Sequence, residues 1–333
     1  MTTEALFTFA HVTDMHLWSP ANKHVPEEDR ILCNHQNDVV TPVVESLNAA
    51  TEHPRPDFVV FGGDNIHGDY NDLTMCEVET RMLKERLDRL EIPYVIICHN
   101  HDTWGEDAVS TRMICTSVWT PPQQHVWREP YAGTQYRRFF GANALCYTRT
   151  MPGDFVCIFM SEQYVETGTG IFITLDAKLG WLDDRLREAK GKHVLLFTHV
   201  PLMWPRHTRT HELWPVDNDR GGKFMMDHRA AFRVRELLAR HGNVVAHYSG
   251  HTHVHSHMQS EGTHFVGTAG LYNEPGEYRL VSVMQGRIEH QCVRPAALGT
   301  RPKIWKNCVD DLHSTAELFH AGLPHERDFT IEY

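Results

Sequence analysis

The chain has 333 residues, of which 41% are hydrophobic and 23% are charged, a composition typical of a soluble globular protein. Its formal net charge of −11 disfavours a nonspecific nucleic-acid binder, which needs a basic surface. No run of about 18 apolar residues occurs, and the start lacks the basic and apolar regions of a secretory signal, so neither a membrane span nor export is predicted. The eight scattered cysteines form no CxxC pair, which favours reduced thiols in a cytoplasmic protein.

Strand and helix patterns alternate along much of the chain. Five short apolar runs are typical of buried strands: residues 6–12, 57–61, 94–98, 193–197 and 243–249. Amphipathic helical patterns separate several of them, over residues 38–50, 76–90, 176–191 and 227–242. This alternation predicts an α/β fold.

Two β-rich stretches interrupt the alternation. Residues 121–161 indicate a loop followed by β-hairpins, with Pro152-Gly153 as a turn, and residues 263–293 follow the last strand–helix unit. Two β regions joined by crossover helices predict two sheets packed face to face with helices outside. Residues 294–333 lack clear periodicity, and we interpret them as an extended arm or a partner contact.

Each of the five predicted strands is followed by side chains that can bind metals. In chain order these are Asp14, His16, Asp64, Asn100, His101, His199, His251 and His253. Because the C-terminal strand ends of an open α/β sheet share one edge, we expect these residues to meet. The i, i+2 spacing in an extended segment also sends Asp14 and His16 to the same side, and likewise His251 and His253.

The donor types indicate a pair of metals. Leaving His101 aside, three carboxylate or amide oxygens and four imidazoles make seven ligands, too many for one tetrahedral ion but suited to two ions that share a carboxylate. Mixed nitrogen and oxygen donors without thiolate favour Zn²⁺, Mn²⁺ or Fe. Two ions roughly 3.5–4 Å apart can bind both oxygens of an in-line phosphoryl displacement and acidify a water. A single DxH or HxH motif is weak, since a histidine after a strand is usually an ordinary polar residue; the whole series carries the prediction.

The ordered series DMH, GGDN, NHD, TH and GHTH resembles the calcineurin-like metallophosphoesterase superfamily over roughly residues 6–270. It is most similar to the bacterial class III cyclic-nucleotide and glycerophosphodiester phosphodiesterases. The resemblance implies a four-layer αββα sandwich with two divalent or mixed-valence metal ions per chain, Mn, Fe or Zn. It also implies that residues 1–293 form the phosphoesterase domain, with an active-site loop insertion over 103–136, and that 294–333 are a C-terminal extension.

The same resemblance implies a role for each site residue. One metal would be held by Asp14, His16 and His253. The other would be held by Asn100, His199 and His251, with Asp64 bridging the ions. Asn100 and His101 would contact the substrate phosphate, His101 would protonate the leaving oxygen, and Asp102 would orient this region.

One position departs from the family pattern. The family usually has glycine directly before the Asn-His pair, whereas this chain has His99. Glycine at such a position often serves a backbone conformation that a Cβ disfavours. We interpret His99 as an adaptation of the turn; an added polar group near the substrate is the alternative.

Substrate determinants are harder to identify. Arg206 and Arg209 follow His199 closely, so we expect them to contact a phosphate or a second anionic group; a solvated loop is the alternative. The sequence thus predicts a cytoplasmic phosphodiesterase acting on a small-molecule phosphodiester. A phosphomonoesterase is the close alternative, because the same centre serves both. The complete ligand set disfavours a noncatalytic scaffold, and the acidic net charge disfavours a nuclease. The sequence leaves open whether the protein forms a homo-oligomer.

Overall fold

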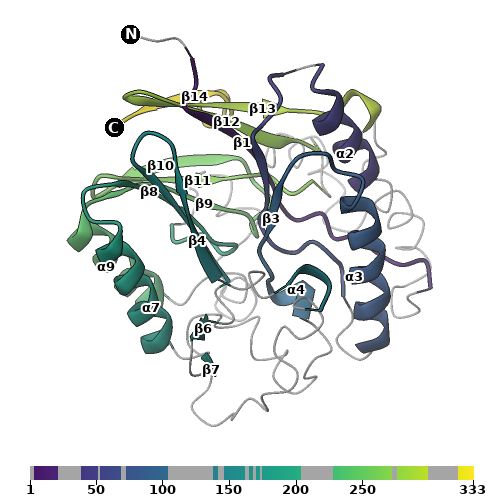
Figure 1. Cartoon of the computed structure of the whole chain (residues 1–333), viewed down its shortest axis with the longest axis horizontal. Coiled ribbons are helices and arrows are strands. Elements are labelled where there is room, and N and C mark those ends of the chain that lie inside the picture. The colour runs from purple at the N-terminus through teal and green to yellow at the C-terminus, as the bar shows by residue number, and fades with distance from the viewer. Residues whose placement is uncertain are drawn as a thin grey trace, which may run out of the picture.

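Two six-stranded β-sheets pack face to face, with helices on their outer faces (Figure 1). The computed structural model describes residues 4–21, 39–51, 53–68, 73–103, 138–141, 146–161, 165–167, 170–172, 175–203, 228–271, 276–298 and 322–333. The mixed α/β sandwich predicted from the sequence is confirmed.

The first sheet has the strand order β14-β13-β12-β1-β2-β3. Its strands are β1 (Phe7–Val12), β2 (Phe58–Phe61), β3 (Tyr94–Ile96), β12 (Tyr278–Met284), β13 (Arg287–Val293) and β14 (Phe329–Glu332). The strands β1, β2 and β3 run parallel, and β12 pairs antiparallel with β1. The ends of the three parallel strands therefore point to one edge of this sheet.

The second sheet has the order β10-β11-β9-β8-β5-β4. Its strands are β4 (Cys146–Met151), β5 (Phe155–Met160), β8 (His193–Phe197), β9 (Val244–Ser249), β10 (Ser256–Ser260) and β11 (Thr263–Gly267). Parallel pairs join β5 to β8, β8 to β9 and β9 to β11. The short strands β6 (Val165–Thr167) and β7 (Gly170–Phe172) form a separate ribbon.

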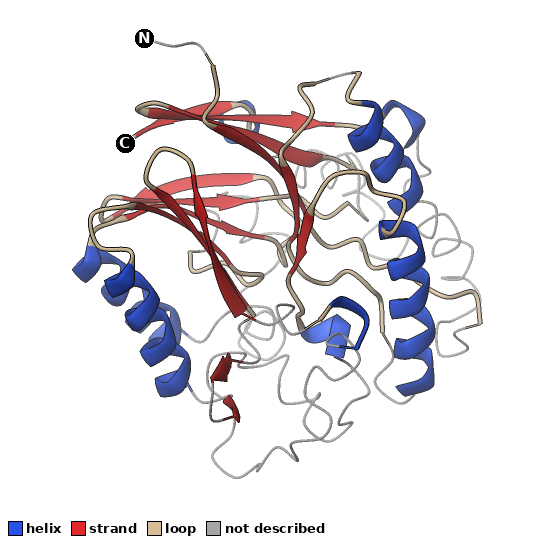
Figure 2. Ribbon diagram, viewed as in Figure 1, coloured by secondary structure: helices blue, strands red, loops and turns tan. Residues whose placement is uncertain are grey.

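Helices cover the outer face of each sheet (Figure 2). The helices α2 (Val40–Ala49) and α3 (Leu73–Leu87) lie on the first sheet, and α7 (Leu175–Glu188) and α9 (His228–His241) lie on the second. Pro42 is the third residue of α2, where the first turn has no backbone partner for an N–H, so the helix tolerates it. Shorter helices are α4 (Asn100–Thr103), η3 (Ala296–Leu298) and α11 (Pro324–Arg327).

An aromatic core lies between the sheets. On β2, Phe58 faces this inter-sheet core while Phe61 packs toward the helices, because successive strand residues point to opposite faces. The Phe9 ring stacks on Phe58 with centroids 5.5 Å apart and meets the Phe197 ring of the other sheet edge-on at 5.3 Å. These contacts hold β1 and β8 in fixed relation, and both strands lead into predicted ligands.

Two segments near the C-terminal end fold differently from what their sequence patterns indicated. The stretch 263–293 divides between the sheets, with β11 in the second and β12 and β13 in the first. The end of the aperiodic segment 294–333 adds β14 to the edge of the first sheet, paired with β13. The domain limit at residue 293 stays a prediction, and the insertion predicted over 103–136 lies, apart from Thr103, outside the described residues.

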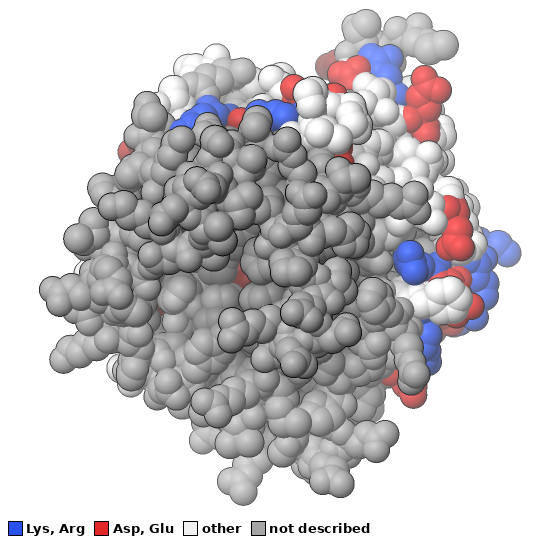
Figure 3. Space-filling model, turned by 180° about the vertical axis from the view of Figure 1, so that it is seen from behind, with Lys and Arg blue, Asp and Glu red and all other residues white. Residues whose placement is uncertain are grey.

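Charges are mixed where described residues reach the surface seen from behind, with acidic and basic side chains side by side (Figure 3). On α7, for example, Arg185 pairs with Glu188 at 2.6 Å and Arg187 with Asp184 at 2.7 Å. No helix within the described ranges is long and apolar enough to cross a membrane.

Buried histidines make stability depend on pH. His247 is fully buried, with Nε2 2.7 Å from the Thr198 hydroxyl, and burial lowers its pKa to about 3. The unfolded chain binds this proton near pH 6.5, so from there down to about pH 3 it holds more protons than the folded form. The free energy of unfolding should therefore fall with falling pH, by up to about 1.4 kcal/mol per pH unit for each such histidine.

We predict that His247→Gln weakens this pH dependence by up to the contribution of one histidine. Urea unfolding of chelator-treated protein at several pH values between about 7.5 and 5 measures the slope. A slope identical to that of the parent would show that His247 is not held neutral by the fold.

Candidate metal centre

Loops from both sheets meet where their parallel strands end. Strands β1, β2 and β3 lead into Asp14, Asp64 and the turn at His99, while β8 and β9 lead into His199 and His251. The His251 N–H donates to Asp14 Oδ2 at 3.0 Å, and His199 Nδ1 donates to the Gly62 carbonyl at 2.8 Å. Both hydrogen bonds cross from one sheet to the other, so the predicted meeting of five strand ends occurs in one place.

Five of the predicted ligands have left-handed backbones. Their φ angles are Asp14 52°, His16 44°, Asp64 49°, His251 65° and His253 56°. Non-glycine residues in this region cost on the order of 1–3 kcal/mol each and persist only where the surroundings enforce them. The DMH segment is thus not extended as its spacing suggested. Backbone bonds from Asp14 N to Gly63 O, 3.0 Å, and from His16 N to Asp64 O, 2.9 Å, hold it against the next loop.

A first group of candidate ligands consists of Asp14, His16 and His253, whose donor atoms all lie within 4.8 Å of one another. His253 Nε2 is 3.1 Å from Asp14 Oδ1 and 3.3 Å from His16 Nε2. These three residues are the set that the family resemblance assigns to one metal.

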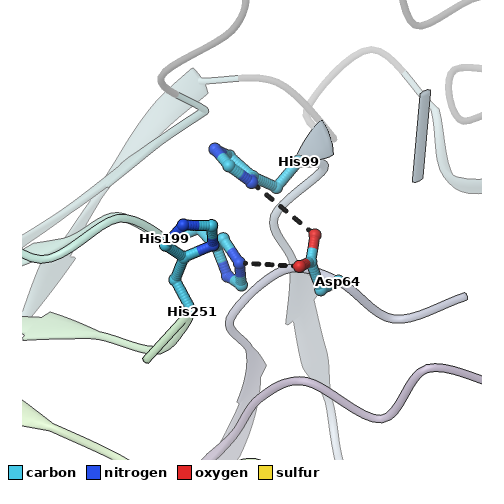
Figure 4. A group of neighbouring side chains, drawn as sticks. All are labelled: Asp64, His99, His199 and His251. Carbon is cyan, nitrogen blue, oxygen red and sulfur yellow. Dashed lines mark ion pairs between the residues drawn. The ribbon is translucent and has the colours of Figure 1, made fainter. Parts of the chain in front are cut away.

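A second group consists of Asp64, His99, His199 and His251, again within 4.8 Å (Figure 4). His199 Nε2 lies 3.2 Å from Asp64 Oδ2, and His99 Nδ1 lies 3.6 Å from Asp64 Oδ1. Asp64 Oδ2 is also 3.9 Å from His16 Nε2 of the first group. Asp64 therefore stands between the two groups, as a bridging carboxylate must.

The sequence reasoning noted His99 but did not place it among the metal-binding candidates. Its side chain is fully buried, and its φ is not among the positive values of the described non-glycine residues, so its backbone does not call for glycine. The His99 ring lies beside Asp64, His199 and His251 in the second group. In the sequence, the replacement of the usual glycine by histidine was the sign that this residue belongs to the site. The backbone of Asn100 begins α4, but its side chain lies outside what the structure describes.

The protonation states suit metal binding. Burial opposes ionisation of Asp14, but His253 and His199 hold its pKa well below the usual value; His199 and His101 do the same for Asp64 against its burial. Burial lowers the pKa of His99 to about 3 and that of His251 to about 4. Charged carboxylates beside neutral imidazoles are the forms that ligate metals.

The hydrogen bonds of His199 also indicate a cation site beside Asp64. Because a carbonyl can only accept, the contact with Gly62 assigns the proton of a neutral His199 ring to Nδ1. Its Nε2 is then an acceptor that faces the Asp64 carboxylate at 3.2 Å. Two acceptors in this relation are stabilised by a cation between them, and fixing one ring nitrogen by a backbone carbonyl is the usual support of a metal-bound histidine.

His101 lies beside both groups. Its Nδ1 donates to the His67 carbonyl at 2.6 Å, which leaves Nε2 on the side of Asp64, 3.9 Å from Oδ2. The ring meets His16 edge-on with centroids 4.4 Å apart. Burial lowers the pKa of His101 to about 3, against the opposing effect of Asp64. His67 comes within reach of His16 and His101 and was not singled out from the sequence.

Asp102 ties two loops together. Its buried carboxylate accepts the backbone N–H of Asn65 at 2.9 Å, of Ile66 at 3.1 Å and of His99 at 2.9 Å. The first two lie just after Asp64, so one side chain fixes the position of Asp64 relative to His99. Asp102 touches the backbone of the site, and none of these contacts is to a metal-ligating atom.

The approach of the loops requires glycine at two positions. A Cβ on Gly63, whose φ is 102°, would lie 2.5 Å from His199 Nδ1, and one on Gly250 would lie 2.4 Å from Asp14 Oδ2.

Arg206 and Arg209, predicted to contact substrate, lie outside the described residues.

We predict that Asp102→Ala destabilises the protein by at least about 3 kcal/mol, since three buried N–H groups lose their acceptor at about 1–3 kcal/mol each. Asp102→Asn, which keeps one carbonyl oxygen, should lose less. Chemical denaturation with and without added metal measures both variants. An Asp102→Ala protein as stable as its parent would show that this carboxylate does not hold the loops.

Comparisons with known proteins agree with this geometry. The model of the calcineurin-like phosphoesterase family matches residues 7–255. A dimetal phosphatase from Danio rerio superposes with a TM-score of 0.60 and 14% identity, covering 99% of this chain and 100% of that one. The phosphopantetheinyl hydrolase of Mycobacterium tuberculosis is 14% identical over 79% of this chain and 89% of that one, with a TM-score of 0.41 that is too low to support a conclusion. No curated protein matches the sequence. Because the family match spans most of the chain, the protein belongs to the calcineurin-like phosphoesterases, which hydrolyse phosphoesters at a binuclear metal centre.

Proposed function

We propose that the protein is a phosphodiesterase that hydrolyses a small-molecule phosphodiester at two metal ions. The observation that carries the proposal is the pair of candidate ligand groups with Asp64 lying between them and His101 beside both. The sequence resemblance to class III phosphodiesterases favours a diester over a monoester. Two ions at such a centre polarise the phosphoryl oxygens and acidify a water when bound.

Different residues of the chain would hold the two ions and the phosphate. Asp14, His16 and His253 would hold one ion, and Asp64 would be shared with the group of His199 and His251. Asn100, by the resemblance, would contact the second ion and the phosphate. These contacts would place a phosphoester beside His101.

His101 would give the leaving oxygen a proton from Nε2. The hydrogen bond to the His67 carbonyl fixes the ring with this nitrogen on the side of Asp64. In the free protein the low pKa, about 3, keeps the ring neutral at pH 7. The negative charge of a bound phosphoester favours the protonated ring, so proton uptake would accompany binding.

Metal-loaded protein should hydrolyse bis-nitrophenyl phosphate, cyclic nucleotides or glycerophosphodiesters with higher kcat/KM than nitrophenyl phosphate. The measurement is initial rates across this panel with Mn²⁺, Zn²⁺ or Fe²⁺. Asp64→Ala, which removes the shared carboxylate, is the control and should abolish the activity. Preference for the monoester would make the protein a phosphomonoesterase, and no hydrolysis of any ester would support the scaffold alternative.

His101→Ala should keep its metals yet lose roughly 10²–10⁴-fold in rate, the usual contribution of a general acid. The loss should be smaller for esters of nitrophenol, a good leaving group that needs little protonation, than for alkyl esters. Rates for both ester classes and elemental analysis of the loaded variant measure this. Equal losses for both classes would assign His101 to binding the phosphate rather than to proton transfer.

Specificity for a distal anionic group is proposed to reside in the segment that contains Arg206 and Arg209, because it follows the predicted ligand His199 closely. A charge-assisted hydrogen bond from either arginine is worth about 1.5–3 kcal/mol.

A further inference from the structure

We infer that His99 is a ligand of the second metal position, which then receives three imidazoles and one carboxylate from His99, His199, His251 and Asp64. The inference rests on the proposed two-metal centre and assigns to this chain a ligand that its family pattern lacks, since the family usually has glycine there. It replaces our sequence-based interpretation of His99 as an adaptation of the turn.

The geometry of the four side chains carries the inference. Figure 4 shows the three rings grouped on one side of the Asp64 carboxylate, each from a different loop. The His99 ring centroid lies 4.2 Å from that of His199 and 5.8 Å from that of His251. Four donors at tetrahedral Zn²⁺ bond lengths of about 2.0–2.2 Å lie about 3.3–3.6 Å apart. The contacts of Asp64 with the His99 and His199 nitrogens, 3.6 and 3.2 Å, are close to this spacing, although they involve different carboxylate oxygens.

The ring of His99 is held where a ligand needs to be. The backbone N–H of His99 donates to Asp102 Oδ2, and the other oxygen of that carboxylate accepts the backbone N–H groups of Asn65 and Ile66, which follow Asp64. The side chain is fully buried at the end of the run that forms β3. Because the two loops share one anchor, His99 and Asp64 keep their relative position without help from a metal.

The His99 ring would make the two metal positions unequal. With Asp64 shared, the second position would have three imidazoles, the Asp64 carboxylate and Asn100, whereas the first would have two imidazoles and two carboxylates from His16, His253, Asp14 and Asp64. We therefore expect the second position to bind its ion more tightly and to favour Zn²⁺, and the first position to exchange its ion more readily.

The experiment measures metal binding without any substrate. The parent, His99→Gly and His99→Ala are titrated with Zn²⁺ against a competing chelator, and bound metal is counted by elemental analysis. We expect two ions in the parent, and a loss of at least about 10–100-fold in affinity at one position in both variants, the scale known for supporting residues of metal sites. His253→Ala is the matched control and should weaken the other position, so His99→Gly together with His253→Ala should weaken both.

Two further readouts separate ligation from a structural role. Co²⁺-loaded parent should show a visible absorption spectrum that changes in His99→Gly, and added imidazole should restore the parent spectrum by occupying the space of the lost ring. Circular dichroism and urea unfolding of the metal-free proteins report whether the variants fold, with His99→Asn as a polar substitute if the smaller residues do not.

The outcomes distinguish this inference from the proposed function. Unchanged affinity at both positions and an unchanged Co²⁺ spectrum in folded His99 variants would show that His99 is not a ligand, while leaving the phosphodiesterase proposal intact. A single ion in the saturated parent would overturn the two-metal centre and the inference with it. Loss of metal without hydrolysis of any ester by the parent would support His99 as a ligand and reject the proposed reaction.

Discussion

The buried Asp64 carboxylate is the constraint on which the site depends. It lies within 3.2 Å of His199, 3.6 Å of His99 and 3.9 Å of His16, so residues from both sheets converge on one anion. Taking a charge out of water is costly unless it is paired. Asp14 is buried nearby, and its negative charge repels that of Asp64. A divalent cation between the two carboxylates would compensate both charges.

The fold supplies the rigidity that this convergence needs. Phe9, Phe58 and Phe197 pack between the sheets, so the strand ends that carry the ligands cannot slide past each other without disturbing the aromatic core. The strain of five left-handed ligand residues is concentrated at the same edge. Strain of this kind persists where packing and hydrogen bonds leave no alternative, and here it aims the side chains of short loops at one point.

Asp102 and His99 link the rigid loops to the candidate metal positions. Asp102 fixes the main chain of the loops after Phe61 and Ile97 through its carboxylate, and His99 would bring the second group from two imidazoles to three. With two imidazoles at one position and three at the other, the ions would differ in affinity and exchange. Such an asymmetric centre can retain one ion while the other exchanges more readily.

The sequence by itself determined the element types, the order of the loops at the site and most of the residues that meet there. Short apolar runs and helical hydrophobic patterns report burial along the chain, and the polar residues after Val12, Phe61, Phe197 and Ser249 stand out against them. Only the tertiary structure decided that residues 263–293 divide between two sheets, that β14 closes the edge of the first sheet, and that His99 points at Asp64. These features depend on contacts between segments far apart in the chain. A local pattern cannot reveal them, because the direction of a side chain in a turn is set by the neighbouring loops that pack against it.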